Sequence, residues 1–146
     1  MKAPPRLIED QLFGRLSWNE DTGWWEGLVA AGRGEVHKLS VQPRSKHDRT
    51  ISEEARRIFA EVGRDLEGVR HHALREFINQ TRKYPFYRDL TFERLDSVMR
   101  PGPILIRSDG YLEVGFVDPD ETIFEGGHLI VSRFWPSGTR EVILDG

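Results

Sequence analysis

One regular apolar stripe runs through the middle of this 146-residue chain. Thr50 and Glu53 form a capping-box pattern at its start, and the pattern continues to about Arg82. Gly63 and Gly68 each cost about 1 kcal/mol relative to Ala inside a helix, so a break at either glycine stays open. A stripe this regular needs a sheet or another helix to cover it. Its residues recur at steps of three and four, as on one face of an α-helix: Ala55, Ile58, Phe59, Val62, Leu66, Val69, Ala73, Leu74, Phe77 and Ile78.

Strand patterns flank this helical region on both sides. Three short apolar runs between residues 12 and 42 are separated by turn-forming residues, which predicts a β-meander. Residues 104–116 predict a hairpin with a type I′ turn at its Asp-Gly pair. A second hairpin is expected at residues 128–144, with its turn at 136–138. Thr91 is placed to cap a short helix before the hairpins.

The order of these elements predicts the fold class. Three strands, a long helix, a short helix and four strands indicate an α+β domain with a mostly antiparallel sheet of about seven strands. We assign residues 1–146 to a single domain, as expected for a chain of this length. It comprises an N-terminal meander at 12–42, a helical segment at 50–100 and C-terminal hairpins at 103–146.

Alternation along the strands predicts which side chains face the core. His37 is in phase with Leu39 and Val41, so we expect it to be a hydrogen-bonded packing residue. The last hairpin is less constrained, because a slip of one residue exchanges its two faces. One register gives a shared buried face to four residues: Leu129, Val131, Val142 and Leu144.

Composition excludes several kinds of site. The chain has no cysteine, which excludes disulfides, thiol nucleophiles and thiolate metal sites. It also lacks a G-x-S-x-G nucleophile motif and a phosphate-binding loop ahead of a helix, and we expect no cofactor. Its longest apolar runs are about four residues, against the roughly 20 that a membrane helix needs. Residues 1–10 carry prolines and charges that do not suit a secretory signal, so we expect a cytoplasmic protein.

Charge is distributed unevenly along the chain. The net charge is −3, but residues 101–146 alone hold 3 basic and 8 acidic residues. An electronegative surface attracts basic partners and repels nucleic acid, which favours a protein partner and argues against nucleic acid. The alternative is a solvated acidic face that serves solubility. Four carboxylates are the candidate binding residues: Asp118, Asp120, Glu121 and Glu125.

Tryptophans supply candidate anchors for the same partner. Trp24 and Trp25 are adjacent in a predicted strand and must point to opposite faces, so one of them is more exposed than a core residue. Aromatic residues with arginine nearby are enriched at protein interfaces. We select Trp25 and Trp135 as anchors. The alternative is core packing on one side of the sheet and cover of its edge on the other.

A histidine and glutamate cluster is the candidate metal site. His72 and Glu76 lie four residues apart, so on a helix they share a face and could bind zinc with a third ligand such as His128. That site would support a metal-dependent hydrolase. However, the helix lacks the second histidine of the H-E-x-x-H motif. We therefore assign no catalytic or metal residue and keep the hydrolase, and an oligomerising structural module, as alternatives to a binding domain.

Several segments resemble an uncharacterised family of small bacterial domains that is known only as a domain of unknown function. They are FGRLSWNEDTGWWEGLV near the start, LTFERL at 90–95, the strands around Asp109-Gly110, and a closing F-x-x-G-H-x-I-V with a terminal glycine. Relatives are often found near secreted toxins, so the resemblance implies an immunity protein that binds a toxin, such as a basic nuclease. It also implies that His128 hydrogen-bonds to neighbouring backbone and fixes its loop.

Overall fold

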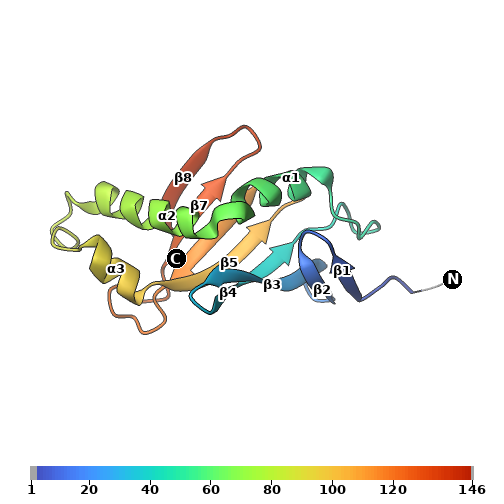
Figure 1. The fold of residues 1–146 in the computed structure, drawn as a ribbon, viewed down its shortest axis with the longest axis horizontal. Helices are drawn as coiled ribbons and strands as arrows, with labels where there is room; N and C mark the ends of the chain where they lie inside the picture. Colours follow the sequence, from blue (N-terminus) through green and yellow to red (C-terminus); the bar gives the residue numbers. More distant parts are fainter. Residues whose placement is uncertain (1–2, 146) are drawn as a thin grey trace.

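The structure, a computed structural model, describes residues 3–145 (Figure 1). Strands begin and end the chain, and the helices lie between the fourth and fifth strands. The strands are β1 (Leu7–Asp10), β2 (Gly14–Asn19), β3 (Trp24–Gly32), β4 (Glu35–Val41), β5 (Arg100–Ile106), β6 (Leu112–Val117), β7 (Leu129–Phe134) and β8 (Arg140–Asp145). The helices are α1 (Glu53–Val62), the 3₁₀ turn η1 (Gly63–Asp65), α2 (Leu66–Thr81) and α3 (Phe92–Val98).

All eight strands form one sheet in the order of the sequence. Neighbouring strands are antiparallel except β4 and β5, which are parallel because the helical segment carries the chain back across the sheet. The predicted α+β class with a mostly antiparallel sheet is confirmed. The strand count is eight rather than seven, because β1 pairs with β2 at the edge of the sheet. This strand has the sequence LIED, which is too short and polar to show alternation.

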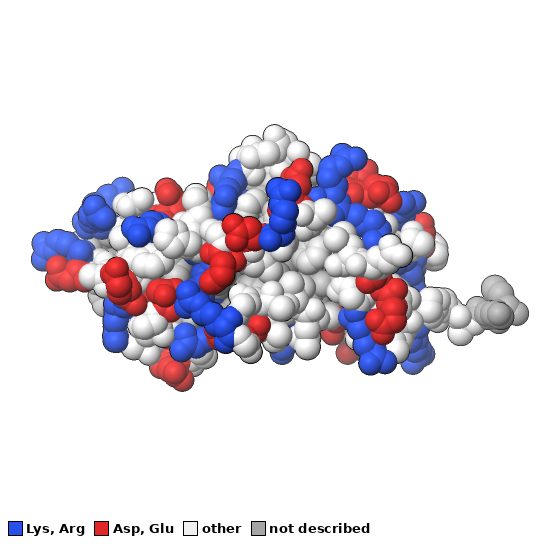
Figure 2. Space-filling model, viewed as in Figure 1, with Lys and Arg blue, Asp and Glu red and all other residues white. Residues whose placement is uncertain are grey.

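The helices lie together on one face of the sheet (Figure 1). Helix α1 packs on β6, and α2 packs on β7, β8 and β3. Their apolar stripe and the strand residues that point toward it form the main core cluster. Acidic and basic side chains are interspersed on the side shown in Figure 2, around an uncharged area below the helices. No helix among residues 3–145 is both long enough and apolar enough to cross a membrane.

One detail of the helical segment differs from the prediction, and a second decides between alternatives that the sequence left open. Ser52, rather than Thr50, caps α1, and its hydroxyl accepts a hydrogen bond from the Ala55 N–H at 3.1 Å. Ser52 is also fixed from outside the helix, because it donates to the Ser108 carbonyl at 2.7 Å. The stripe is broken by the 3₁₀ turn at Gly63–Asp65, after which the Asp65 carboxylate caps α2. Thr91 caps α3 as predicted.

The hairpin between β5 and β6 does not contain the predicted type I′ turn. A type I′ turn needs positive φ at both central residues, but Gly110 has φ 91° and Asp109 is not among the residues with positive φ. The turn instead runs from Arg107 to Gly110, whose N–H donates to the Arg107 carbonyl at 3.0 Å. The β7–β8 hairpin repeats this form, with Gly138 at φ 93°.

The register of the last hairpin also differs from the prediction. Ile130 pairs with Leu144 and Ser132 pairs with Val142, and these residues point toward the helices. Leu129 and Val131 therefore point to the other face of the sheet, so the predicted shared face of Leu129, Val131, Val142 and Leu144 is wrong. Every residue from Leu129 to Val131 and from Val142 to Leu144 is apolar, so the sequence shows no alternation that would indicate which residues face the core.

Candidate protein-binding surface

The face of the sheet that points away from the helices, called the open face below, is apolar across several strands. Leu28 is 63% exposed and Val36 is 49% exposed. Both lie next to core-facing residues, and alternation directs them away from the helices. No helix or strand among residues 3–145 covers them. The apolar residues that the register places on the open face are Leu28, Ala30, Val36, Pro103, Leu105, Val117, Leu129, Val131 and Ile143.

The middle of the open face is closely packed by its own residues. Val131 is only 2% exposed, although it lies outside the main core cluster. Gly115 pairs with Val131 and has no side chain. A Cβ added at Gly115 would lie 3.3 Å from the Pro103 ring, so the proline closes over this strand. The apolar residues therefore extend over six strands of the open face. Polar and charged side chains lie among them on the same face: Glu26, Lys38, Ser40, Glu113, Arg133 and Glu141.

An aromatic pair lies at one end of the open face. Trp135 follows the core-facing Phe134, and its ring lies 5.3 Å from that of Tyr111. The Tyr111 hydroxyl donates to the Glu113 carboxylate at 2.6 Å. Burial and this carboxylate raise the pKa of Tyr111 to about 12, so its hydroxyl stays protonated at neutral pH. Trp135 is thus half-buried and held in place, as an interface anchor would need to be.

The loop between β6 and β7 borders the other end of the open face and carries the predicted acidic residues. Asp118 is buried, and its carboxylate accepts hydrogen bonds from the Ile123 and Phe124 N–H groups at 2.6 and 3.1 Å. It therefore organises the loop and presents no charge to a partner. The three remaining carboxylates are exposed at the surface: Asp120, Glu121 and Glu125.

We expect Asp118→Ala to destabilise the protein by about 1–3 kcal/mol at neutral pH, because it leaves one buried and one partly buried N–H group without an acceptor. Burial raises the pKa of Asp118, but the backbone N–H groups outweigh it and hold the pKa below the ordinary 3.8. The stabilisation is therefore present above the unfolded-state pKa and is lost as pH falls through the lower folded-state value. Urea unfolding near pH 7 and near pH 3 measures both effects.

The exposed Asp120→Ala is the matched control, for which we expect less than about 0.5 kcal/mol. An Asp118→Ala loss that is the same at both pH values would contradict the role given to the carboxylate.

Trp25 is not an exposed anchor. It is 1% exposed, and its indole N–H donates to the Arg49 carbonyl at 2.7 Å. Trp24 is the more exposed of the adjacent pair, as required by their opposite directions. The adjacent tryptophans could not be told apart from sequence, because either orientation satisfies strand alternation.

The three candidate metal ligands are not brought together. His72 and Glu76 line the same cavity against β8, but His128 does not line that cavity. Within residues 3–145 no group of three His, Cys, Asp or Glu side chains is arranged to hold a metal. No hydrogen bond joins the His128 ring to another residue among 3–145, so the expectation that it fixes the loop stays a prediction. Two glycines with positive φ, Gly126 and Gly127, shape the chain before it.

Comparisons with known proteins do not extend this description. No family model, no curated protein and no solved structure matches the chain. The resemblance to the bacterial family therefore stays a prediction.

A second group of exposed aromatics was missed by the sequence interpretation. Phe86 is 79% exposed and Tyr84 is 51% exposed, in the loop between α2 and α3. A signal for this group is present in the sequence, since basic residues flank three aromatics in RKYPFYR at 82–88. These two aromatic side chains and the basic residues around them form a small feature in the loop between α2 and α3. The open face is larger and spans six strands, and it borders the acidic loop.

Proposed function

We propose that this protein is a non-enzymatic binding domain that uses the open face to dock onto a protein partner. The observation that supports the proposal is the set of apolar side chains that the open face carries on every strand from β3 to β8, over which no described helix or strand packs. Most monomeric proteins expose apolar side chains singly, and larger apolar patches with polar rims mark interaction sites. Val36 and Leu28 are the most exposed members, and Trp135 supplies an aromatic anchor at the rim.

The charge around the open face favours a basic partner. Asp120, Glu121 and Glu125 lie on the loop that continues from Val117 and returns to Leu129. A partner with an apolar centre and basic rim would match both features. Charges at a rim mainly accelerate association and select the partner, while the apolar centre supplies most of the affinity.

The resemblance to immunity-associated domains adds a finer proposal. A basic toxin, such as a nuclease, would have the charge that this surface requires, and blocking it in the cell that produces it would place this protein in the cytoplasm. Both statements rest on the resemblance and on charge complementarity. The hydrolase alternative has no such support, because the proposed ligands do not converge.

Affinity capture with matched variants tests the proposal. The chain is immobilised as wild type, as Leu28→Glu/Val36→Glu, and as Ala60→Glu, which places a carboxylate on the exposed surface of α1. We expect one basic protein to bind the wild type and the α1 control equally, and to bind the open-face variant at least about tenfold more weakly. Equal recovery on all three would refute binding through this face.

Charge reversal tests the acidic loop separately. For the captured partner, we expect Asp120→Lys/Glu121→Lys/Glu125→Lys to lower the association rate by about tenfold or more at low salt and to leave the dissociation rate nearly unchanged. The difference from wild type should shrink as salt screens the charges. An association rate that is independent of both charge and salt would contradict a basic partner.

A further inference from the structure

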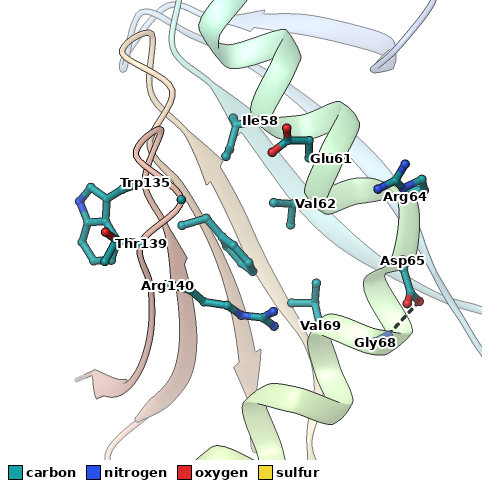
Figure 3. Close-up of a pocket in the computed structure, with 12 residues that line it drawn as sticks. Ile58, Glu61, Val62, Arg64, Asp65, Gly68, Val69, Trp135, Thr139 and Arg140 are labelled. Atoms are coloured by element: carbon teal, nitrogen blue, oxygen red, sulfur yellow. Dashed lines mark hydrogen bonds between the residues drawn. The ribbon is translucent and has the colours of Figure 1, made fainter.

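A groove lies between the helices and the β7–β8 hairpin, on the opposite side of the sheet from the open face. Two adjoining cavities of about 570 and 600 Å³ make up this groove, and Arg140 lines both. Each has a volume within the roughly 300–1,000 Å³ range of small-molecule sites. Figure 3 shows the first cavity, with Val62 and Val69 on its helical wall and Arg140 reaching across from the hairpin.

Arg140 is a cation without a carboxylate partner among the described residues. The neighbouring Arg133 points to the open face and pairs with Glu141 at 3.3 Å. Arg140 instead lies over the Phe134 ring, with its guanidinium carbon 4.9 Å from the ring centroid. Arg140 is exposed as a whole residue, but burial of part of its side chain lowers the pKa of the guanidinium below its ordinary value. A partly dehydrated guanidinium favours a bound carboxylate, with which it can form two hydrogen bonds.

His72 adds a ring nitrogen without a hydrogen-bond partner to the same groove. Its Nδ1 atom is buried and has no hydrogen-bond partner in the described part of the chain. Burial lowers the pKa of His72, and the nearby charge of Arg140 lowers it further, while Glu76 on the same helix face raises it. The ring is therefore neutral at pH 7, so Arg140 supplies the positive charge and His72 contributes a polar contact.

The walls of the groove limit what it can hold. The helical side of the first cavity is apolar at Ile58, Val62 and Val69. Glu61 and Asp65 lie on the same side, and the Asp65 carboxylate is engaged by the Gly68 N–H at 2.9 Å. Glu76 and Glu141 line the second cavity. Together the carboxylates of the two cavities would repel a polyanion such as nucleic acid or a polyphosphate. The groove therefore suits one negative charge on an otherwise apolar molecule.

We propose that this groove binds a small organic carboxylic acid, whose carboxylate contacts Arg140 and whose apolar body lies against Ile58, Val62 and Val69. This site lies on the opposite side of the sheet from the open face and does not depend on the proposed protein partner. Trp135 and Ile143 belong to both descriptions, because they lie on the β7–β8 hairpin at the edge of the sheet. The ligand class follows from the unpaired Arg140 beside an apolar wall of limited size. Arg64, the other cation that lines the first cavity, points away from Arg140 (Figure 3).

Calorimetry and NMR with a defined probe test this site. The probe is 4-phenylbutyrate, and its uncharged amide has the same apolar body. The variant is Arg140→Gln, and Arg57→Gln on the exposed surface of α1 makes the same change of charge away from the groove. We expect saturable binding of the acid to the wild type and to Arg57→Gln. Binding of the acid to Arg140→Gln, and of the amide to the wild type, should be at least about tenfold weaker.

The imidazole NMR signal of His72 gives a second measurement on the same samples. We expect the pKa of His72 to rise in Arg140→Gln, because a neighbouring positive charge is removed, and to rise in the wild type when the anionic probe binds. The proposal would be overturned if Arg140→Gln bound the acid as tightly as the wild type does, or if the wild type bound the acid and the amide equally. It would also be overturned if the wild type bound inorganic phosphate as tightly as the acid, or showed no saturable binding of the acid below about 10 mM.

Discussion

Trp25→Ala is expected to lower the free energy of unfolding by about 3–5 kcal/mol, the range for removing a large aromatic side chain from a packed core. The ring is 1% exposed, and it meets the Trp18 ring edge-on at 5.0 Å between centroids. Its indole N–H also donates to the Arg49 carbonyl at 2.7 Å, which ties the meander to the segment before α1. Denaturant unfolding measures the loss.

Trp24→Ala is the matched control, because Trp24 is the adjacent tryptophan and points to the other face. We expect it to cost less than about 1.5 kcal/mol, since its ring is only partly buried. Trp25→Phe, which keeps an apolar ring and removes the indole N–H, should fall between the two and remain folded. Equal losses for Trp24→Ala and Trp25→Ala would contradict the packing described here.

Asp96→Ala is expected to destabilise the protein by about 3 kcal/mol, because it leaves Arg70 charged and without its carboxylate. Arg70 is 6% exposed, and its Nε and Nη2 atoms donate to the Asp96 carboxylate at 3.1 and 3.0 Å. Nη2 also donates to the carbonyls of Asp96 and Met99 at 2.8 and 3.0 Å, so this pair joins α2 to the end of α3. Asp89→Ala removes an exposed carboxylate from the neighbouring loop and should cost less than about 0.5 kcal/mol.

A double variant separates the charge effect from lost packing. Arg70→Met fills much of the same volume without a charge, so Arg70→Met/Asp96→Ala should be more stable than Asp96→Ala alone. Burial raises the pKa of Asp96, but the Arg70 guanidinium and the charge of Arg33 outweigh it and leave the pKa below 3.8. The contribution of Asp96 should accordingly disappear as pH falls through that lowered value. If the loss of stability in the double variant equalled the sum of the losses in Arg70→Met and Asp96→Ala, the explanation by an unpaired buried cation would be contradicted.

Strong periodicity made much of the fold predictable from sequence. The helix stripe and the alternation around His37 placed their residues in the core, and His37 is 1% exposed, with its Nδ1 atom donating to the Gly102 carbonyl at 2.8 Å. Thr91 was identified as a helix cap from local chemistry alone. Ser52 was not identified as the α1 cap, because its position is fixed by a hydrogen bond to the Ser108 carbonyl, which is distant in the sequence.

Candidate site residues were harder to predict, because the relevant strands are apolar on both faces. The run from Leu129 to Val131 fits either register, and the adjacent Trp24 and Trp25 fit either orientation. An apolar run of this kind does not show which side chains face the core. It does indicate that the strand is apolar on both faces, as expected where both faces are covered. The burial of Asp118 could not be predicted from sequence either, because it depends on how the β6–β7 loop folds around the carboxylate.

Site-specific photocrosslinking tests the proposed docking surface most directly. A benzophenone amino acid replaces Val36 on the open face, where the side chain is 49% exposed. In a second protein it replaces Ala60 on the exposed side of α1. Both proteins are irradiated in cells that produce them, and the covalent adducts are identified by mass spectrometry. We expect one basic protein to be attached at Val36 and nothing at Ala60. Attachment at Ala60 alone, equal attachment at both positions, or a second copy of this chain as the only adduct at Val36 would contradict the account.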